Sequence, residues 1–311
     1  MKNGPLILTL GEPAGIGIEI SFKAAEALNG EIPFFAIGDF QKLKKISRNY
    51  NIDIKKISCP SEVYNNKNYL CIFDHKLEKP IQSGVIDLKN AAQVISSIKI
   101  AVKLIKDKKA SGLVTCPINK WALKVGANFK FSGHTEYLSE LDGSKKKPVM
   151  MLASPSGFRV VPVTTHIPIK KVPKLLTKKL LFNTILTVSD SLKQDFGIQQ
   201  PRLLITGLNP HSGENSTIGM EEKEIIEPTI KEAGLTGIKL DGPVSADTAF
   251  SETNRAKFDA FICMYHDQAL IPIKTIAFSK ATNITLGLSF VRTSPDHGTA
   301  LDIAHKNSAD P

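Results

Sequence analysis

Short β-branched runs alternate with longer amphipathic runs along this 311-residue chain, and this alternation restricts the fold more than any other feature. In residues 88–106, apolar side chains such as Val94, Ile98 and Ala101 recur at three- and four-residue steps, which indicates one buried helix face. The pattern is typical of α/β proteins. We expect strands at residues 6–10, 34–37, 70–73, 112–115, 149–153, 159–164, 202–207, 260–264 and 283–286. We expect helices at residues 17–28, 88–106, 171–196 (as one helix or two) and 220–233.

The domain organisation is less clearly marked. A mass of 33.9 kDa is enough for one large core or two moderate ones. Asp142, Gly143 and the lysines at 145–147 form a plausible turn at a domain edge, but no linker or break in composition divides the chain. Two α/β subdomains that share a sheet region, with a central cleft between them, fit this lack of a linker.

The net charge of +10 raises the question of nucleic-acid binding. The lysines are spread along the chain without interleaved aromatic residues, and no zinc-finger, RNP or helix-turn-helix signature accompanies them. Solvated helix faces and turns explain most of them, and a positive field also suits an anionic substrate. We expect no nucleic-acid partner.

The N-terminus and the cysteines bear on location. The first apolar stretch is only a few residues long before Gly11, so it predicts a strand and not a signal peptide or membrane span. Four cysteines are scattered without a CxxC motif, which favours reduced thiols and a cytoplasmic protein.

Three histidines each follow a short apolar run. They are His166 in VVPVTTHIP, His211 in LLITGLNPHSGE and His266 in FDAFICMYHDQ. In α/β proteins the carboxyl ends of strands carry the functional groups, and three protein ligands with one open position is the usual catalytic metal site. One such histidine alone is more often structural, but three in the same context predict a divalent-metal site.

A glycine-rich segment, TLGEPAGIGIEI, leads from the first expected strand into a helix. Gly11, Gly15 and Gly17 have the spacing GxxxGxG and not the dinucleotide spacing GxGxxG. Glycines here allow a close backbone approach to a ligand at a helix N-terminus. A tight turn and a ligand loop both remain open.

Two further motifs have competing interpretations. In FSGHTEYL, His134 and Thr135 stand where an anion could meet a helix N-terminus. The alternative is a helix capped by Ser132 or Thr135, with His134 as a surface residue. Near the histidines, Asp247 and Asp267 could orient imidazoles, approach the metal or accept a proton, or they are a helix cap and a surface acid.

The last part of the chain concentrates polar groups. Lys274, Asn283 and Arg292 supply two cations and an amide, and arginine forms a fork suited to phosphate or carboxylate. The loop SPDHGTALDIA contains Asp296 and His297 and is of the kind that wraps a ligand.

Taken together, these segments resemble the 4-hydroxythreonine-4-phosphate dehydrogenase family of vitamin B6 biosynthesis. The resemblance rests on GEPAGIGIE, TCPINK, SGHTEYL, THIP, LNPHSGE, GPVSADTAF, YHDQALIPIK and residues 283–304, which follow in order along nearly the whole chain. The fold it implies is similar to that of isocitrate and isopropylmalate dehydrogenases. Their GDGIGPE and HGSAPDIA segments look like residues 11–19 and 297–304.

The resemblance also implies roles for single residues. His166, His211 and His266 match the family's divalent-metal ligands (zinc, magnesium or cobalt), which come from both subunits of a homodimer that shares its active site. The matching substrate-binding positions are His134, Thr135, Lys274, Asn283 and Arg292. The matching cofactor segments, for NAD or NADP, include Gly11, Gly15, Gly17, Asp296, His297 and Gly298. Residues 1–129 with 280–311 would form the subdomain on the NAD side, and 130–279 the subdomain with the metal ligands and the dimer interface.

The activity that follows from the resemblance is NAD-dependent oxidation of 4-phosphonooxy-L-threonine to a 3-oxo acid, which decarboxylates to 3-amino-2-oxopropyl phosphate. A family dehydrogenase acting on a phosphorylated sugar acid such as threonate 4-phosphate is the alternative, and a phosphate-ester or acyl-phosphate transferase is a remote one. Two departures affect the cofactor region. Glu12 replaces the usual aspartate, and Ala304-His305-Lys306-Asn307 replaces Ala-Gly-Lys-Gly. Family members usually continue with a further helix beyond the position of Pro311.

Overall fold

The chain forms two compact α/β units, seen here in a computed structural model that describes residues 4–144 and 146–311. Of the described residues, those up to 143 and those from 288 to 311 form unit 1, and those between 144 and 287 form unit 2. The expected class, α/β with two units, is confirmed. The expected boundaries at 129/130 and 279/280 lie earlier in the chain than the boundaries of these units. The predicted likeness to isocitrate dehydrogenase stays a prediction.

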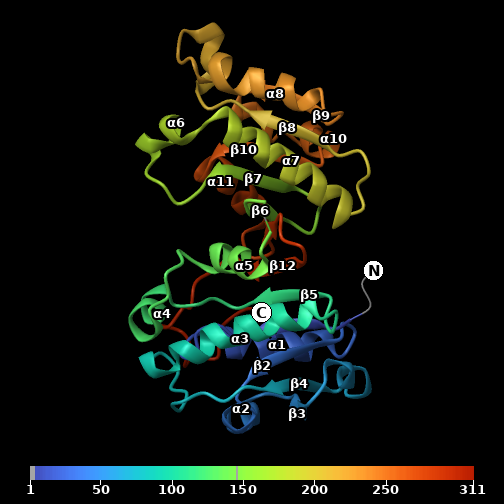
Figure 1. Ribbon diagram of the computed structural model, residues 1–311, viewed down its shortest axis with the longest axis vertical. Helices are drawn as coiled ribbons and strands as arrows, with labels where there is room; N and C mark the ends of the chain where they lie inside the picture. Colours follow the sequence, from blue (N-terminus) through green and yellow to red (C-terminus); the bar gives the residue numbers. More distant parts are fainter. Residues whose placement is uncertain (1–3, 145) are drawn as a thin grey trace. The chain divides into compact units, whose positions relative to one another are not determined.

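Unit 1 is built on parallel strands (Figure 1). Their order is β3-β4-β2-β1-β5-β12. The strands are β1 (Leu6–Thr9), β2 (Phe34–Gly38), β3 (Asp53–Ile57), β4 (Tyr69–Asp74), β5 (Gly112–Thr115) and β12 (Val291–Pro295). Because all of them run the same way, their carboxyl ends meet at one edge, where the glycine-rich segment and the TCPINK segment begin.

Helices cover both faces of this sheet, because successive strand side chains point to opposite faces. Ile7 packs in a core with α3, α4 and α5, and Leu8 packs in a separate core with α1 and α2. The helices are α1 (Gly17–Leu28), α2 (Phe40–Ile46), α3 (Ala91–Lys106), α4 (Lys120–Ala127) and α5 (His134–Asp142). Short 3-10 turns lie at η1 (Ser47–Asn49), η2 (Pro60–Asn65) and η3 (Leu88–Asn90).

Unit 2 has a mixed sheet with strand order β11-β6-β7-β10-β8-β9. The strands are β6 (Val149–Ala153), β7 (Arg159–Thr164), β8 (Arg202–Thr206), β9 (Lys239–Val244), β10 (Ala260–Tyr265) and β11 (Thr282–Leu286). The pairs β11–β6 and β6–β7 are antiparallel, whereas β7, β10, β8 and β9 are mutually parallel. The carboxyl ends of β7, β10 and β8 are therefore neighbours.

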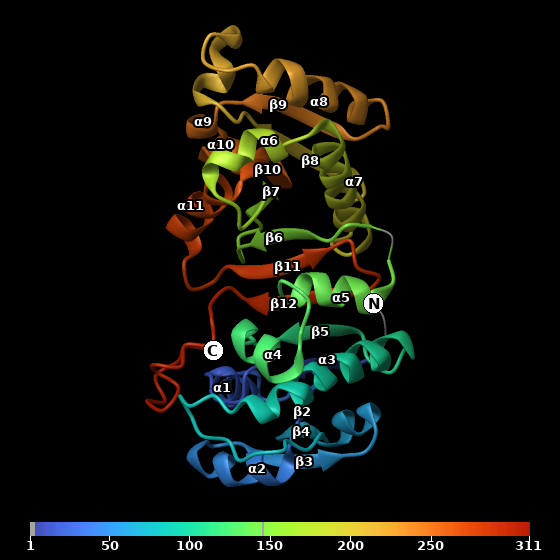
Figure 2. The same ribbon diagram turned by 60° about the vertical axis from the view of Figure 1, so that its left-hand side comes forward.

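The helices of unit 2 also divide between two faces (Figure 2). One core joins α7 and α8 to side chains such as Val161, Ile205 and Ile262, and the other joins α9 and α11 to Val160, Leu204 and Phe261. The helices are α6 (Val172–Leu175), α7 (Lys178–Gln194), α8 (Glu227–Gly234), α9 (Ala246–Ala249), α10 (Glu252–Lys257) and α11 (His266–Ala277). The remaining turns are η4 (Ile169–Lys171), η5 (Pro210–Ser216) and the π-helical η6 (Glu222–Ile226).

Every expected strand is present, and the expected helix at 171–196 is two helices, divided where Thr177 caps α7. In the described part of the chain, no helix is both long enough and apolar enough to cross a membrane.

Candidate functional site

The three histidines stand at the carboxyl ends of three neighbouring parallel strands of unit 2. His166 follows β7, His266 follows β10 directly, and His211 follows β8 after a short turn. Since β10 pairs with both β7 and β8, the strand order brings the three segments to one edge of the sheet.

His166 and His266 lie close together. Their ring centroids are 5.4 Å apart, with the planes tilted by 46°. The carboxylate of Asp267 lies 2.7 Å from Nδ1 of His266, which fixes the ring and leaves Nε2 for another partner. A carboxylate behind a histidine is the usual arrangement around a metal-binding imidazole, so Asp267 suits an orienting role.

Within one chain, His211 does not form a three-ligand group with His166 and His266. Its side chain is 68% exposed and its Nδ1 lies 3.8 Å from a carboxylate oxygen of Glu214. Among the described residues, no group of three or more His, Cys, Asp or Glu side chains is arranged to hold a metal ion. One chain thus supplies two neighbouring imidazoles and a third, exposed one on the adjacent strand end.

Asp247 belongs to the His211 side of unit 2. Its pKa is lowered, chiefly by a hydrogen bond of 2.5 Å from the Ser245 hydroxyl and also by the nearby charge of His211. The carboxylate is exposed at the start of α9, where the dipole of such a short helix adds little. An orienting role and a proton-accepting role both remain open for it.

A cluster of cationic and polar groups surrounds the N-terminus of α5 in unit 1. Arg292 is only 4% exposed, and its Nε and Nη2 donate to Oγ1 of Thr115 at 3.2 and 2.6 Å. Gly133 precedes α5 without a side-chain cap, and a Cβ atom there would lie 3.6 Å from Nζ of Lys120. The uncapped amides and both cations form a setting suited to an anion.

His134 is held neutral within this cluster. Burial lowers its pKa to about 3, and the charges of Arg292 and Lys120 act in the same direction. Its Nε2 is buried and has no hydrogen-bond partner among the described residues. Burial also lowers the pKa of Arg292, to about 10. His134 is therefore a neutral hydrogen-bonding group beside two positive charges, and Thr135 follows it in the first turn of α5.

The other expected substrate residues belong to unit 2. Lys274 lies in the last turn of α11, with its ammonium 5.1 Å from the Phe278 ring. Asn283 is half-buried on β11, opposite Leu152 of β6.

Backbone packing explains the three glycines of the first loop. A Cβ atom on Gly11 would lie 2.2 Å from the carbonyl oxygen of Pro117. A Cβ atom on Gly15 would lie 2.7 Å from the carbonyl oxygen of Thr299, and one on Gly17 would lie 2.2 Å from the carbonyl oxygen of Leu10. Close backbone packing therefore accounts for glycine at all three positions, and a ligand role would come in addition to it.

The glycine-rich loop also contacts the loop after β12. The amide of Ile16 donates to the Thr299 carbonyl at 3.1 Å, which joins the two segments that were expected to bind the cofactor. His297 is exposed, and its Nδ1 lies 2.8 Å from the Gly298 carbonyl. Glu12 is buried, so its pKa is raised, although the Ala14 amide donates to it at 3.1 Å.

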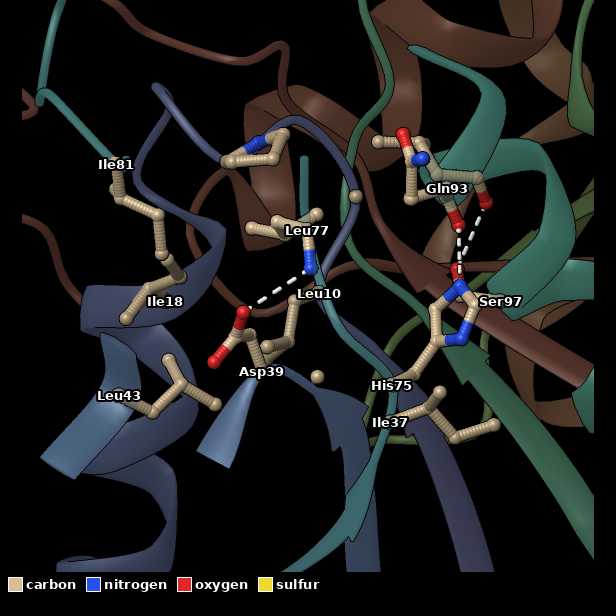
Figure 3. A pocket seen from close by; sticks show the side chains of 14 residues that line it. Leu10, Ile18, Ile37, Asp39, Leu43, His75, Leu77, Ile81, Gln93 and Ser97 are labelled. Atoms are coloured by element: carbon tan, nitrogen blue, oxygen red, sulfur yellow. Dashed lines mark hydrogen bonds between the residues drawn. The ribbon is translucent and has the colours of Figure 1, made fainter. Parts of the chain in front are cut away.

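A small cavity of about 30 Å³ lies beneath the glycine-rich loop (Figure 3). Leu10, Ile18 and Leu77 line it, together with Asp39 and His75. The Asp39 carboxylate accepts from the Leu77 amide at 3.0 Å, and Nε2 of His75 lies 3.1 Å from the Gln93 carbonyl. A cavity of this volume holds one or two water molecules, so it is not a ready-made adenine pocket.

Two residues beside the candidate sites were not singled out from the sequence. Lys120 stands in TCPINK, just after the end of β5, and its place at a strand end was the available signal. Glu222 lies in the segment after His211, and its burial could not be read from the run of acidic residues around it.

The chain is similar to known proteins over nearly its whole length. Residues 31–311 match the family model described as "Pyridoxal phosphate biosynthetic protein PdxA". The chain is 47% identical to the 4-hydroxythreonine-4-phosphate dehydrogenase of Paracoccus denitrificans, over 98% of this chain and 93% of that one. It is 45% identical to the enzyme of the same name from Roseobacter denitrificans, over 99% of this chain and 93% of that one.

A solved structure gives the same result. The crystal structure of 4-hydroxythreonine-4-phosphate dehydrogenase from Klebsiella pneumoniae superimposes with a TM-score of 0.91 and 32% identity, over 99% of this chain and 95% of that chain. The family model, the relatives and the fold thus agree over nearly the whole length, and the chain belongs to the PdxA family of 4-hydroxythreonine-4-phosphate dehydrogenases.

Proposed function

We propose that this protein oxidises 4-phosphonooxy-L-threonine with NAD or NADP, in the biosynthesis of pyridoxal 5'-phosphate. The product is the 3-oxo acid, which loses carbon dioxide to give 3-amino-2-oxopropyl phosphate. The observation that carries the proposal is family membership over nearly the whole chain, joined to a histidine at each of three neighbouring strand ends.

The residues of unit 2 fit a divalent ion such as zinc, cobalt or magnesium. His166 and His266 present neighbouring rings, Asp267 fixes one of them, and His211 stands exposed on the next strand end. Neutral imidazole is a common ligand of catalytic metals. A divalent ion held by these residues would lower the pKa of the substrate hydroxyl, and a nicotinamide cofactor would accept the hydride.

The chain's own residues bind and orient the substrate. Arg292 and Lys120, with the first amides of α5, offer positive charge and donors to a phosphate or carboxylate. His134 is neutral, so it can donate one hydrogen bond without adding charge. Holding both anionic ends of the substrate fixes the secondary hydroxyl, which reduces the entropic part of the barrier. Lys274 and Asn283, in unit 2, are proposed as further substrate-binding residues.

The proposed assembly is a homodimer in which each active site takes ligands from both subunits. Exposed apolar side chains stand on the segments that carry the histidines: Ile169 after His166, Met220 after His211, and Ile271 after His266. Exposed apolar residues on all three histidine segments favour a protein interface, and a second copy would supply the imidazole that one chain leaves apart. The cytoplasmic location expected from the scattered cysteines stays a prediction.

A spectrophotometric assay tests the proposal. NADH formation at 340 nm should require 4-phosphonooxy-L-threonine, NAD and a divalent ion, and threonate 4-phosphate should give far less. Equal turnover of both substrates would favour the sugar-acid dehydrogenase instead. No NADH with either substrate would leave a phosphate-ester or acyl-phosphate transferase as the remaining alternative.

The metal ligand set can be tested separately. His211→Ala should abolish metal-dependent NADH formation while the protein stays folded, because one of three ligands is lost. Lys223→Ala, an exposed change in the same part of the chain, serves as the control. Undiminished turnover in His211→Ala would remove His211 from the mechanism.

A further inference from the structure

The turn that carries His211 has an unusual backbone. All six residues at 211–216 have positive φ: 50° at His211, 50° at Ser212, 79° at Gly213, 40° at Glu214, 53° at Asn215 and 74° at Ser216. This is a short left-handed turn, which L residues adopt singly but rarely in succession. Such a backbone persists only where its surroundings fix it.

The carboxylate of Glu222 provides much of that fixing. Its Oε1 accepts from the amides of Leu208 and Asn209, each at 2.7 Å, and its Oε2 accepts from the Asn209 side-chain amide at 2.9 Å. The three bonds anchor the two residues that lead from β8 into the turn. One side chain thus sets the direction in which the chain enters residues 211–216.

Glycines fit around the same carboxylate. A Cβ atom at Gly213, inside the turn, would lie 2.7 Å from Oε2 of Glu222, and one at Gly207 would lie 3.1 Å from Oε1. At Gly219, a Cβ atom would lie 2.2 Å from Nδ2 of Asn209. The Glu222 carboxylate therefore lies close to Gly213 inside the turn and close to Gly207 ahead of it.

Glu222 is buried, at 3% exposure, and these hydrogen bonds come from donors of the two residues that lead into the turn. Burial alone would raise its pKa, but the hydrogen bonds from Asn209 and Leu208 hold the pKa below its usual range. The group is thus a buried anion whose hydrogen bonds serve the backbone before His211.

We propose that Glu222 is a positioning residue for the metal site: its carboxylate holds the left-handed turn 211–216 in the one conformation that presents His211 as a ligand. The inference rests on the proposed function, since it assumes that His211 binds the ion. Groups that hold a metal ligand in place commonly change metal affinity 10–100-fold when they are replaced.

Glu222→Gln is the informative variant. The glutamine oxygen can still accept from both backbone amides, so the fold should persist, but the new amide nitrogen would face the donor of Asn209. Glu224→Gln is the matched control, because Glu224 is an exposed carboxylate two residues away. Gly213→Ala disturbs the turn from inside without removing the carboxylate.

Titration calorimetry with zinc ions alone, on metal-free protein, measures the affinity. We expect zinc binding to weaken about 10-fold or more in Glu222→Gln and in Gly213→Ala, and to change less than about 2-fold in Glu224→Gln. Excess zinc should restore turnover to Glu222→Gln, which a general loss of folded protein would not allow. Equal zinc affinity in Glu222→Gln and Glu224→Gln, with both folded, would overturn the inference.

Amide hydrogen exchange in the metal-free protein is a second measurement, which reports on the stability of the turn itself. Amides of residues 208–217 should exchange faster in Glu222→Gln than in Glu224→Gln, and equal exchange would overturn the inference even if the wild type bound no zinc. Absence of zinc binding in the wild type would instead count against the proposed function. The two failures are therefore distinguishable.

Discussion

Arg292 is a buried cation, and its position favours binding of an anionic group of the substrate. It is only 4% exposed and donates to Thr115 across two neighbouring strands of unit 1. A guanidinium that is already fixed by such contacts loses little entropy when it binds phosphate or carboxylate. Its role should therefore appear in substrate binding more than in cofactor binding.

Arg292→Ala should raise the KM for the phosphorylated substrate by about 100-fold, because a charge-assisted pair contributes about 1.5–3 kcal/mol. The KM for NAD should change little. Steady-state kinetics with each ligand varied separately give both values, and Arg48→Ala, at an exposed arginine, is the control. Equal increases in both KM values would mean that Arg292 does not bind the substrate specifically.

His134 makes stability depend on pH. Its pKa falls to about 3 in the folded protein because of burial, Arg292 and Lys120, so the unfolded chain binds the extra proton first. The free energy of unfolding should fall as the pH is lowered from about 6.5 towards 3. The contribution has a slope of up to about 1.4 kcal/mol per pH unit.

His134→Gln should remove this contribution and flatten the stability profile between pH 6.5 and 5. Urea unfolding at several pH values measures the slope, and His305→Gln, at an exposed histidine, should keep the wild-type slope. Parallel profiles for His134→Gln and the wild type would show that His134 is not held neutral.

For single residues, the sequence predicted where along the fold a residue lies better than it predicted the residue's hydrogen-bond partners. The strand ends place His166, His211 and His266 on adjacent parallel strands, because apolar runs mark where strands stop. The hydrogen bonds of Glu222 were not predictable, since they depend on how the chain returns after the turn.

At the scale of elements, edge strands escaped prediction for a physical reason. β3 and β9 lie at the outer edges of the two strand orders and are mostly exposed, so they lack the apolar runs that mark central strands. β12 was also missed, because in VRTSP polar residues fill the buried positions, Arg292 among them. Central strands with continuous burial, such as β10, were predicted.

The contact between the glycine-rich loop and the loop after β12 can be tested at Gly15. Gly15→Ala would place Cβ 2.7 Å from the Thr299 carbonyl, so the two loops must separate. We expect a loss of about 1–3 kcal/mol of stability, as in other overpacked sites, and a raised KM for NAD.

Thermal unfolding and kinetics with varied NAD measure both effects. Gly234→Ala is the control, because nothing lies within 4 Å of a Cβ there and alanine favours the helix. A Gly15→Ala protein as stable as Gly234→Ala, with an unchanged KM for NAD, would contradict a shared cofactor role for the two loops.

For the whole molecule, the proposed metal site needs a second copy of the chain, because the described residues of one chain hold no group of three ligands. Ile271 on α11 is 66% exposed, close in sequence to His266. Ile271→Glu should convert a dimer to monomers in sedimentation velocity and should weaken zinc binding as well. Leu235→Glu, at an 85% exposed residue away from the histidine segments, should do neither. A wild-type monomer that binds zinc fully would contradict the shared site.

The most direct test of the central claim is an anomalous-scattering map from crystals grown with zinc or cobalt ions. The account predicts one peak per active site, bonded to the imidazoles of His166, His211 and His266 contributed by two subunits. A peak bonded to none of these rings, or rings that remain far apart after the subunits are assembled, would contradict it.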